Sequence, residues 1–248
     1  MNYMGSKNKV AKYIVPIIEQ KIVENKVNTY VEPFVGGANI IDKVNCDTKV
    51  GCDNQKYLIA LLQNLDKIGL LPDEVSKEHY DDVREAYKTK SEKYPDWYVE
   101  AIGFLASYNG RFFDGGYSGI RVTKGGIRNY YDESKRNLEA QVSDLRAVDF
   151  MLGDYKTTSS SYENAVIYCD PPYQNTKKYK SSQEFDYQEF WDWCRKMSEK
   201  NIVLVSEHSA PDDFQCIWEK PVKRSIGRKA NKATEKLFEI KPHREIVS

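Results

Sequence analysis

The junction between an apolar run and the motif Asp170-Pro171-Pro172-Tyr173 constrains the fold of this chain more than any other feature. The length and apolar composition of residues 165–169 predict a short buried strand. This strand has to end at Asp170, because proline has no N–H group to offer a sheet ladder. A carboxylate, a rigid carbonyl group and an aromatic ring are therefore expected at a strand end, which is where open α/β sheets bind ligands.

This arrangement suits a planar base that carries an exocyclic amine. The Asp170 carboxylate and the Pro171 carbonyl can both accept hydrogen bonds from an NH2 group, and the Tyr173 ring can stack on the base. Proline fixes its own φ, so the Pro171 carbonyl is held in place. The alternative is a Pro-Pro turn that only ends a strand and leaves the Asp170 carboxylate in solvent.

A second unit is typical of a site for a nucleoside-bearing cofactor. Residues 29–32 predict a strand that runs into a glycine turn with Gly36 and then a helix. Residues 49–53 predict a second strand that ends in Asp53, and an acid at this place can bind ribose hydroxyl groups. The turn has neither the GxGxxG pattern nor the lysine of a P-loop. The alternative is a plain βαβ unit in which Asp53 caps a helix.

The apolar pattern places the other elements of an α/β fold. Helices are expected where apolar residues recur at helical spacing or form a helix-length run, at residues 9–25, 54–65, 101–106 and 190–197. Strands are expected in short apolar runs at residues 148–152, 202–206, 216–218 and 237–240. Alternating strands and helices predict a mostly parallel sheet.

The texture of the sequence changes between residues 71 and 146. Residues 76–94 are rich in charge and poor in aliphatic side chains, and residues 108–119 are dense in glycine and aromatic residues. Arginine and lysine follow this aromatic stretch, a combination that fits contact with phosphates and bases. We therefore expect an inserted lobe here. The alternative is a hairpin-rich surface whose charges are only solvated.

Residue type and position mark candidates for contact with DNA. Residues 220–236 contain seven Lys or Arg and one acid, Glu235, which makes them the best candidate phosphate patch. The polar and basic residues 174–183 suit a mobile loop over a site. The expected DNA-binding residues are Asn109, Arg111, Arg121, Lys124, Arg128, Lys177, Lys178, Arg224 and Arg228.

Composition excludes several other classes of protein. The formal net charge is +0, so any nucleic-acid surface has to be a local patch. The five cysteines form no CxxC pair, which argues against a disulfide framework and against a zinc knuckle, and no metal is expected. The N-terminus lacks the apolar core of a signal peptide and no apolar stretch reaches transmembrane length. We expect a cytoplasmic protein without a membrane partner.

Taken in chain order, these motifs resemble those of the Dam-type (D12 class) DNA adenine-N6 methyltransferases, which use S-adenosyl-L-methionine. The resemblance rests on Tyr3-x-Gly-x-Lys7, on residues 31–36 (Val-Glu-Pro-Phe-Val-Gly), on Asp53 and on the DPPY motif at 170–173. It implies a Rossmann-like methyltransferase sheet with helices on both faces. Residues 1–70 and 147–248 would form the catalytic domain, and residues 71–146 an inserted target-recognition lobe, mainly of helices and loops.

The resemblance also implies roles for individual residues. Asp170, Pro171, Pro172 and Tyr173 would be catalytic. The cofactor S-adenosyl-L-methionine would be bound by Tyr3, Lys7, Phe34, Gly36, Asp53, Asp154, Tyr155 and Asp170. Two departures from the family pattern stand out: Ala38 replaces a frequent glycine, and residues 111–116 do not continue the pattern of GATC readers. GATC specificity is therefore not carried over.

The expected function is site-specific methylation of N6 of an adenine that is flipped out of double-stranded DNA, with restriction-modification as the setting and a monomer or weak dimer as the enzyme. The amine would attack the methyl group directly, without a covalent enzyme intermediate. An RNA adenine or N4-cytosine methyltransferase would use the same chemistry, although N4-cytosine enzymes more often carry Ser where Asp170 stands. A non-catalytic DNA-binding regulator on the same fold is the alternative outside enzymes.

Overall fold

The computed structural model describes residues 5–123, 125–173, 185–223 and 232–241. Its helices are α1 (Asn8–Glu24), α2 (Lys56–Leu62), α3 (Lys77–Thr89), α4 (Asp96–Leu105), α5 (Tyr130–Leu145), α6 (Tyr155–Thr158) and α7 (Tyr187–Ser198), with 3-10 turns η1 (Leu65–Leu70) and η2 (Tyr108–Gly110). Its strands are β1 (Thr29–Glu32), β2 (Thr48–Asp53), β3 (Ile120–Thr123), β4 (Gly126–Asn129), β5 (Val148–Leu152), β6 (Val166–Cys169), β7 (Ile202–Glu207), β8 (Phe214–Lys223) and β9 (Lys232–Ile240).

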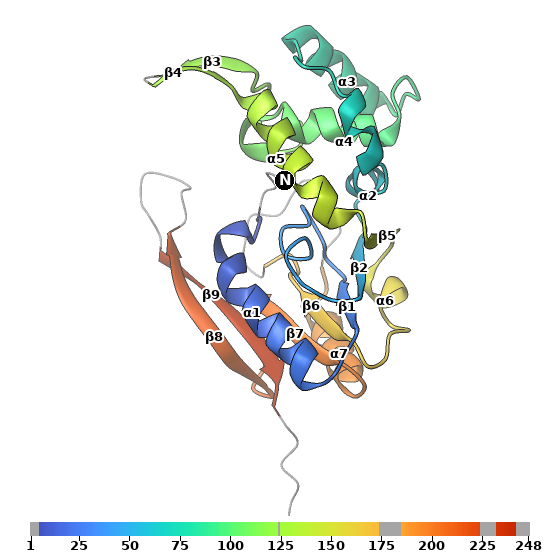
Figure 1. Cartoon of the computed structure of the whole chain (residues 1–248), viewed down its shortest axis with the longest axis vertical. Coiled ribbons are helices and arrows are strands. Elements are labelled where there is room, and N and C mark those ends of the chain that lie inside the picture. Colours follow the sequence, from blue (N-terminus) through green and yellow to red (C-terminus); the bar gives the residue numbers. More distant parts are fainter. Residues whose placement is uncertain (1–4, 124, 174–184, 224–231, 242–248) are drawn as a thin grey trace, which may run out of the picture.

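Seven strands form one mixed sheet in the order β5-β2-β1-β6-β7-β9-β8 (Figure 1). Neighbours from β5 to β7 are parallel, whereas β9 runs antiparallel to both β7 and β8. Ranked by their place in the chain, the strands read 3-2-1-4-5-7-6, so the order reverses between β1 and β6. Open α/β sheets bind their ligands at such a reversal. The expected Rossmann-like sheet is confirmed.

Helices cover both faces of this sheet, because successive side chains of a strand point to opposite sides. Tyr30 and Tyr168 pack in the cluster that contains α1, and Val31 and Ile167 pack in the cluster that contains α7. All four residues of β6 are buried, as expected for a central strand that is covered twice. Figure 1 shows α1 lying across the front of the sheet.

The helix α1 forms because apolar residues recur along it at helical spacing. Val10, Ile14, Ile18 and Ile22 make one buried stripe against the sheet. Lys7 occupies the N-cap position, and its carbonyl oxygen accepts hydrogen bonds from the N–H groups at the start of the helix. Packing of α1 therefore brings Lys7 to the sheet edge described below.

Residues 71–146 contribute α3, α4, α5 and the hairpin of β3 and β4, which lie together at one end of the sheet (Figure 1). Aromatic rings form the interior of this part. The ring centroids of Phe112 and Phe113 are 4.7 Å apart, and that of Phe113 is 5.3 Å from Tyr80. The buried residues here are continuous with those on the α1 face of the sheet. Phe112 and Phe113 therefore face the interior and not a base.

The helix expected between the first two strands is absent, and that prediction is wrong. Residues 33–47 form turns and bends instead. Gly36 and Ala38 have φ values of 48° and 52°, in the left-handed region that ends a right-handed helix. Ala38 is fully buried, and its backbone conformation explains why glycine is frequent at this position of the family motif. β1 and β2 still pair in parallel, so the turn and Asp53 reach the same edge.

Glu100 in α4 is a buried carboxyl group without a partner. It is 0% exposed, and neither of its oxygens has a hydrogen-bond partner among the described residues. Burial raises the pKa of Glu100 well above its usual range, and the nearby charge of Asp53 acts in the same direction.

We expect Glu100→Gln to remove a loss of stability that the wild type shows as the pH rises above the ordinary pKa of a glutamate. A carboxyl group whose pKa is raised by folding contributes stability at low pH, and this stability is lost as the pH rises through the folded-state pKa. Glutamine has nearly the same shape and does not ionise. Urea unfolding at a series of pH values from about pH 4 upward measures the difference. The matched control is Glu85→Gln, whose side chain is exposed. Identical pH profiles for the wild type and Glu100→Gln would contradict the prediction.

Candidate active site

The predicted site residues follow the carboxyl ends of four neighbouring parallel strands. Phe34 and Gly36 follow β1, Asp53 ends β2, and Asp154 and Tyr155 follow β5. The DPPY motif follows β6. Because β5, β2, β1 and β6 are parallel neighbours, these residues share one edge of the sheet.

Asp53 is held by the backbone of the glycine turn. Its Oδ2 accepts a hydrogen bond from the Gly36 N–H at 3.1 Å, and its Oδ1 accepts one from the Gln55 N–H at 3.0 Å. Burial raises the pKa of Asp53 to about 6, although these backbone hydrogen bonds favour the charged form. The carboxylate is therefore oriented before any ligand arrives. The predicted meeting of the glycine turn with this acid is observed.

An aromatic cluster lies beside this turn. The Phe34 ring centroid is 5.2 Å from that of Tyr155 and 5.7 Å from that of Phe190 in α7. Tyr155 is largely buried. Asp154 caps α6, because its side chain accepts a hydrogen bond from the Lys156 N–H at 2.9 Å. Phe34 and Tyr155 thus belong to one packed group of rings. The Asp154 side chain stabilises the start of α6.

Asp170 meets Lys7 across the sheet edge. The Lys7 Nζ is 2.8 Å from the Asp170 Oδ1, and the two side chains are 9% and 20% exposed. Burial raises the pKa of Asp170 above its ordinary value, and the Lys7 ammonium acts in the opposite direction. The Lys7 Nζ also lies 4.4 Å from the centroid of the Tyr173 ring. The predicted grouping of Lys7 with the DPPY motif is therefore observed.

Tyr173 is fixed by Glu235 in β9 and by His208, which directly follows β7. Its hydroxyl donates a hydrogen bond to the Glu235 Oε2 at 2.7 Å, and its ring stands edge-on to His208 with centroids 4.6 Å apart. The Pro172 carbonyl accepts a hydrogen bond from the Tyr187 hydroxyl at 2.8 Å. Sequence reasoning did not include Glu235 and His208. Glu235 had a visible signal, because it is the one acid in the basic stretch from 220 to 236.

The predicted DNA-binding residues of the lobe lie on its surface. Asn109 and Arg111 are exposed. Arg121 and Arg128 are register partners in the β3–β4 hairpin. The Arg121 guanidinium donates to the Tyr117 carbonyl at 2.9 Å, and Arg128 pairs with Glu133. Tyr3, Lys124, Lys177, Lys178, Arg224 and Arg228 lie outside the described residues.

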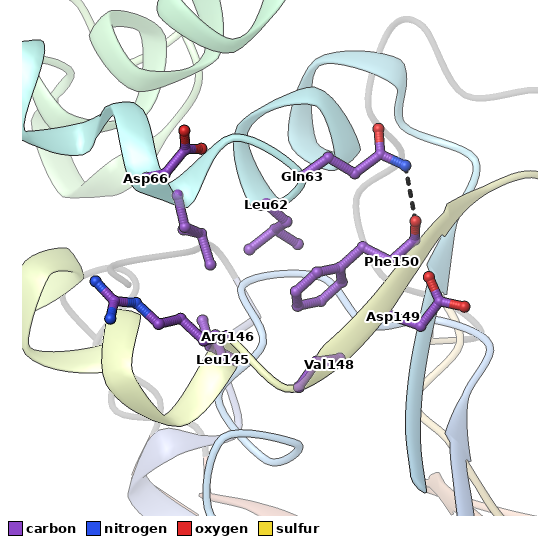
Figure 2. Close-up of a pocket in the computed structure, with 9 residues that line it drawn as sticks. Leu62, Gln63, Asp66, Leu145, Arg146, Val148, Asp149 and Phe150 are labelled. Carbon is purple, nitrogen blue, oxygen red and sulfur yellow. Dashed lines mark hydrogen bonds between the residues drawn. The ribbon is translucent and has the colours of Figure 1, made fainter.

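A cavity of about 350 Å³ lies elsewhere, at the amino end of β5 (Figure 2). Leu62, Leu145 and Phe150 line it, and Gln63 donates a hydrogen bond to the Phe150 carbonyl at 2.7 Å on its wall. None of the predicted site residues lines this cavity. Within the described ranges, no group of three or more His, Cys, Asp or Glu side chains could hold a metal ion. No helix in those ranges has the length and apolar character to cross a membrane.

Comparison with known families identifies the family of this chain. The family described as D12 class N6 adenine-specific DNA methyltransferase matches residues 3–225. The chain belongs to this family. As a D12 class enzyme it methylates adenine at N6 in DNA, and S-adenosyl-L-methionine is its methyl donor. The expected family is confirmed.

Two individual relatives of this D12 class enzyme are also methyltransferases. Type II methyltransferase M.MjaIII of Methanocaldococcus jannaschii is 24% identical over 278 residues, which cover 97% of this chain and 96% of the relative. Type II methyltransferase M.FokI of Planomicrobium okeanokoites is 25% identical over 228 residues, which cover 84% of this chain and 33% of the relative. Both relatives are named as type II methyltransferases.

Two solved structures are similar to this chain at lower sequence identity. TrmN from Thermus thermophilus has 15% sequence identity and a TM-score of 0.26, over 44% of this chain and 34% of that chain. SMU.472, complexed with SAH, has 9% identity and a TM-score of 0.24, over 73% of this chain and 56% of that chain. Both TM-scores lie below 0.5, so the fold class of the D12 enzyme rests on its own strand order.

Proposed function

We propose that this D12 class enzyme recognises a specific sequence in double-stranded DNA, flips out one adenine and methylates its N6 with the DPPY motif as the catalytic centre. The observation that supports this most directly is the placement of Asp170 and Tyr173 at the carboxyl end of β6, beside the reversal of strand order. Flipping costs a few kcal/mol of unstacking and exposes the amine to these groups.

Three groups of the DPPY motif handle the target base in this proposal. The Asp170 carboxylate and the Pro171 carbonyl accept hydrogen bonds from N6, which orients the nitrogen lone pair. The carboxylate also stabilises the positive charge that develops on N6 during attack. The Tyr173 ring stacks on the adenine. Positioning of two bound reactants supplies most of the acceleration, so no cysteine nucleophile takes part.

The residues of the glycine turn fit S-adenosyl-L-methionine. The Asp53 carboxylate is already oriented by two backbone N–H groups and suits the ribose hydroxyl groups. Gly36 has a positive φ and no side chain, which leaves room beside that carboxylate. Phe34 and Tyr155 offer aromatic surface for the adenine ring of the cofactor. When bound, S-adenosyl-L-methionine supplies the methyl group that the N6 amine accepts.

Residues 71–146 act as the target-recognition lobe, and residues 1–70 and 147–248 as the catalytic domain, in the same proposal. Support comes from the position of α3, α4, α5 and the hairpin at one end of the sheet (Figure 1). The hairpin exposes Arg121 and Arg128, and cations of this kind bind backbone phosphates. The enzyme works as a monomer or weak dimer in the cytoplasm.

Incubation of unmethylated DNA with tritiated S-adenosyl-L-methionine, followed by nucleoside analysis, tests the proposal. Label in N6-methyladenine is the expected result, and sequencing of the same product supplies the recognition site. Label in N4-methylcytosine or in RNA alone would overturn the target while leaving the amine chemistry in place. No label from an enzyme that binds the cofactor would favour a non-catalytic regulator.

Tyr173→Ala is expected to weaken capture of the target base more than binding of the cofactor. Stacking of a base on an aromatic ring is worth about 1–3 kcal/mol, so kcat/KM for DNA should fall by about 10-fold to 100-fold. Tyr173→Phe keeps the ring and serves as the matched control. Equal loss of cofactor affinity and of kcat/KM for DNA in Tyr173→Ala would contradict stacking on the target base.

A further inference from the structure

Glu235 lies beside Asp170 and Tyr173, although the sequence marked it only as the one acid in the basic stretch 220–236. It belongs to β9, and its side chain is 14% exposed. Its Oε2 accepts the hydrogen bond from the Tyr173 hydroxyl at 2.7 Å and lies 3.9 Å from the Lys7 Nζ. Lys7 therefore lies between two carboxylates, the nearer one on Asp170 at 2.8 Å.

The charges of this cluster do not cancel. Lys7 contributes one positive charge, whereas Asp170 and Glu235 contribute one negative charge each. Among the described residues, these two largely buried carboxylates around one ammonium group leave a net negative charge in a region of low dielectric constant, where charge acts over longer distances than in water. Such a surplus is costly for an empty site. It suits a site whose reactants carry positive charge.

Both reactants of the proposed reaction carry positive charge at some stage of the reaction. The sulfonium centre of S-adenosyl-L-methionine is cationic, and the attacking amine becomes cationic as the new bond forms. With Glu235 absent, Lys7 would neutralise Asp170, and this pair would offer no net charge to either reactant. With Glu235 present, Lys7 has a second carboxylate within ion-pair distance, so Asp170 can serve the amine without leaving a buried ammonium group unpaired.

We propose that Glu235 is a positioning residue that acts as the second counter-ion of Lys7 and keeps the site net negative for its cationic reactants. The inference rests on the proposed function of the DPPY motif. β9 brings Glu235 to the site because it is inserted between β7 and β8, with Glu235 in register with Lys220. The hydrogen bond from Tyr173 holds the carboxylate in place.

Equilibrium binding of two cofactor forms provides the sharpest test. S-adenosyl-L-methionine carries the sulfonium charge, and S-adenosyl-L-homocysteine is the neutral thioether of nearly the same shape. Glu235→Gln keeps the size and the acceptor oxygen for Tyr173 but removes the charge. We expect its Kd for S-adenosyl-L-methionine to rise by about 5-fold to 20-fold, and that for S-adenosyl-L-homocysteine by less than about 2-fold.

The matched control is Glu219→Gln on the neighbouring strand β8. Glu219 is 62% exposed and lies 3.9 Å from Lys236, so its charge should not reach the site. A merely structural role for Glu235 would weaken both cofactor forms equally. Equal weakening, or no change in either Kd, would overturn the inference.

The rate of methyl transfer distinguishes the two contacts of Glu235, which are the ion pair with Lys7 and the hydrogen bond from Tyr173. Tyr173→Phe breaks the hydrogen bond to Glu235 and leaves the charge near Lys7 unchanged. At saturating DNA and cofactor, we expect Glu235→Gln to be at least about 10-fold slower than the wild type and clearly slower than Tyr173→Phe. Equal rates for these two variants would show that Glu235 acts only through Tyr173, which would overturn the counter-ion role. A wild type that binds cofactor but methylates no DNA would refute the proposed function instead, because the binding test does not depend on DNA.

Discussion

Asp170→Ala should slow methyl transfer by at least about a thousandfold at saturating DNA and cofactor. The carboxylate both orients N6 and stabilises the positive charge that forms there, and removal of one such preorganised group costs about 10²- to 10³-fold in other enzymes. Its position next to a buried, charged Lys7 makes replacement by water ineffective. The measurement is single-turnover transfer of a labelled methyl group.

The fold should survive this substitution. Lys7 loses its nearest partner, but the Glu235 carboxylate remains 3.9 Å away and can accept the ammonium group. Thermal unfolding and cofactor binding therefore serve as readouts of integrity. Asp47→Ala, an exposed acid outside the site, is the matched control for loss of a carboxylate. Near-normal transfer by Asp170→Ala would refute the assignment of the DPPY motif as the catalytic centre.

Asp53→Ala should raise the Kd for S-adenosyl-L-methionine by about 100-fold. Hydrogen bonds from ribose hydroxyl groups to a carboxylate are charge-assisted, and each is worth about 1.5–3 kcal/mol. The Gly36 and Gln55 N–H groups hold this carboxylate in place, so its removal also loosens the turn. Isothermal titration calorimetry of the free enzyme measures the effect without DNA.

The raised pKa of Asp53 also predicts how cofactor binding depends on pH. Binding requires the charged form, and the pKa of Asp53 is raised to about 6. The affinity of the wild type for cofactor should therefore be full above this pH and decline as the pH falls through about 6. Asp53→Asn has no such group and should bind weakly with a flat profile in that range. A wild-type profile that is also flat would contradict a carboxylate contact to the cofactor.

The resting pair of Lys7 and Asp170 has a consequence for the order of events. Asp170 cannot give its full negative charge to the amine while Lys7 is 2.8 Å away. The site therefore has to relax when substrates bind, and Glu235 offers Lys7 a place to move within the same cluster. In the proposed mechanism Lys7 thus offsets part of the Asp170 charge until Lys7 moves toward Glu235, while the three-residue cluster as a whole stays net negative.

The two acids at strand ends could be predicted because the signals are local. Proline cannot continue a ladder, so the strand before Asp170 must stop there, and the short apolar run before Asp53 ends at that acid. The parallel pairing of β1, β2 and β6 then brings both acids to one edge. Motif order completed the family assignment. None of these inferences required a contact between distant residues to be known.

Other features depended on the tertiary structure. The conformation of Gly36 and Ala38 replaced a helix by turns, because both residues adopt left-handed φ in a buried segment. The rings of Phe112 and Phe113 pack inside the lobe because the apolar sides of α3 and α4 need to be covered. Composition alone cannot tell a ring that stacks on a base from one that fills a core.

The sequence by itself determined the strand ends, the acids that stand on them and the family to which the chain belongs. Only the tertiary structure decided which charges surround Asp170. Lys7 lies at the start of α1, and Glu235 lies in β9, 62 residues beyond Tyr173 in the chain. Their meeting depends on the insertion of β9 between β7 and β8, a pairing of distant segments that no local pattern of residues encodes.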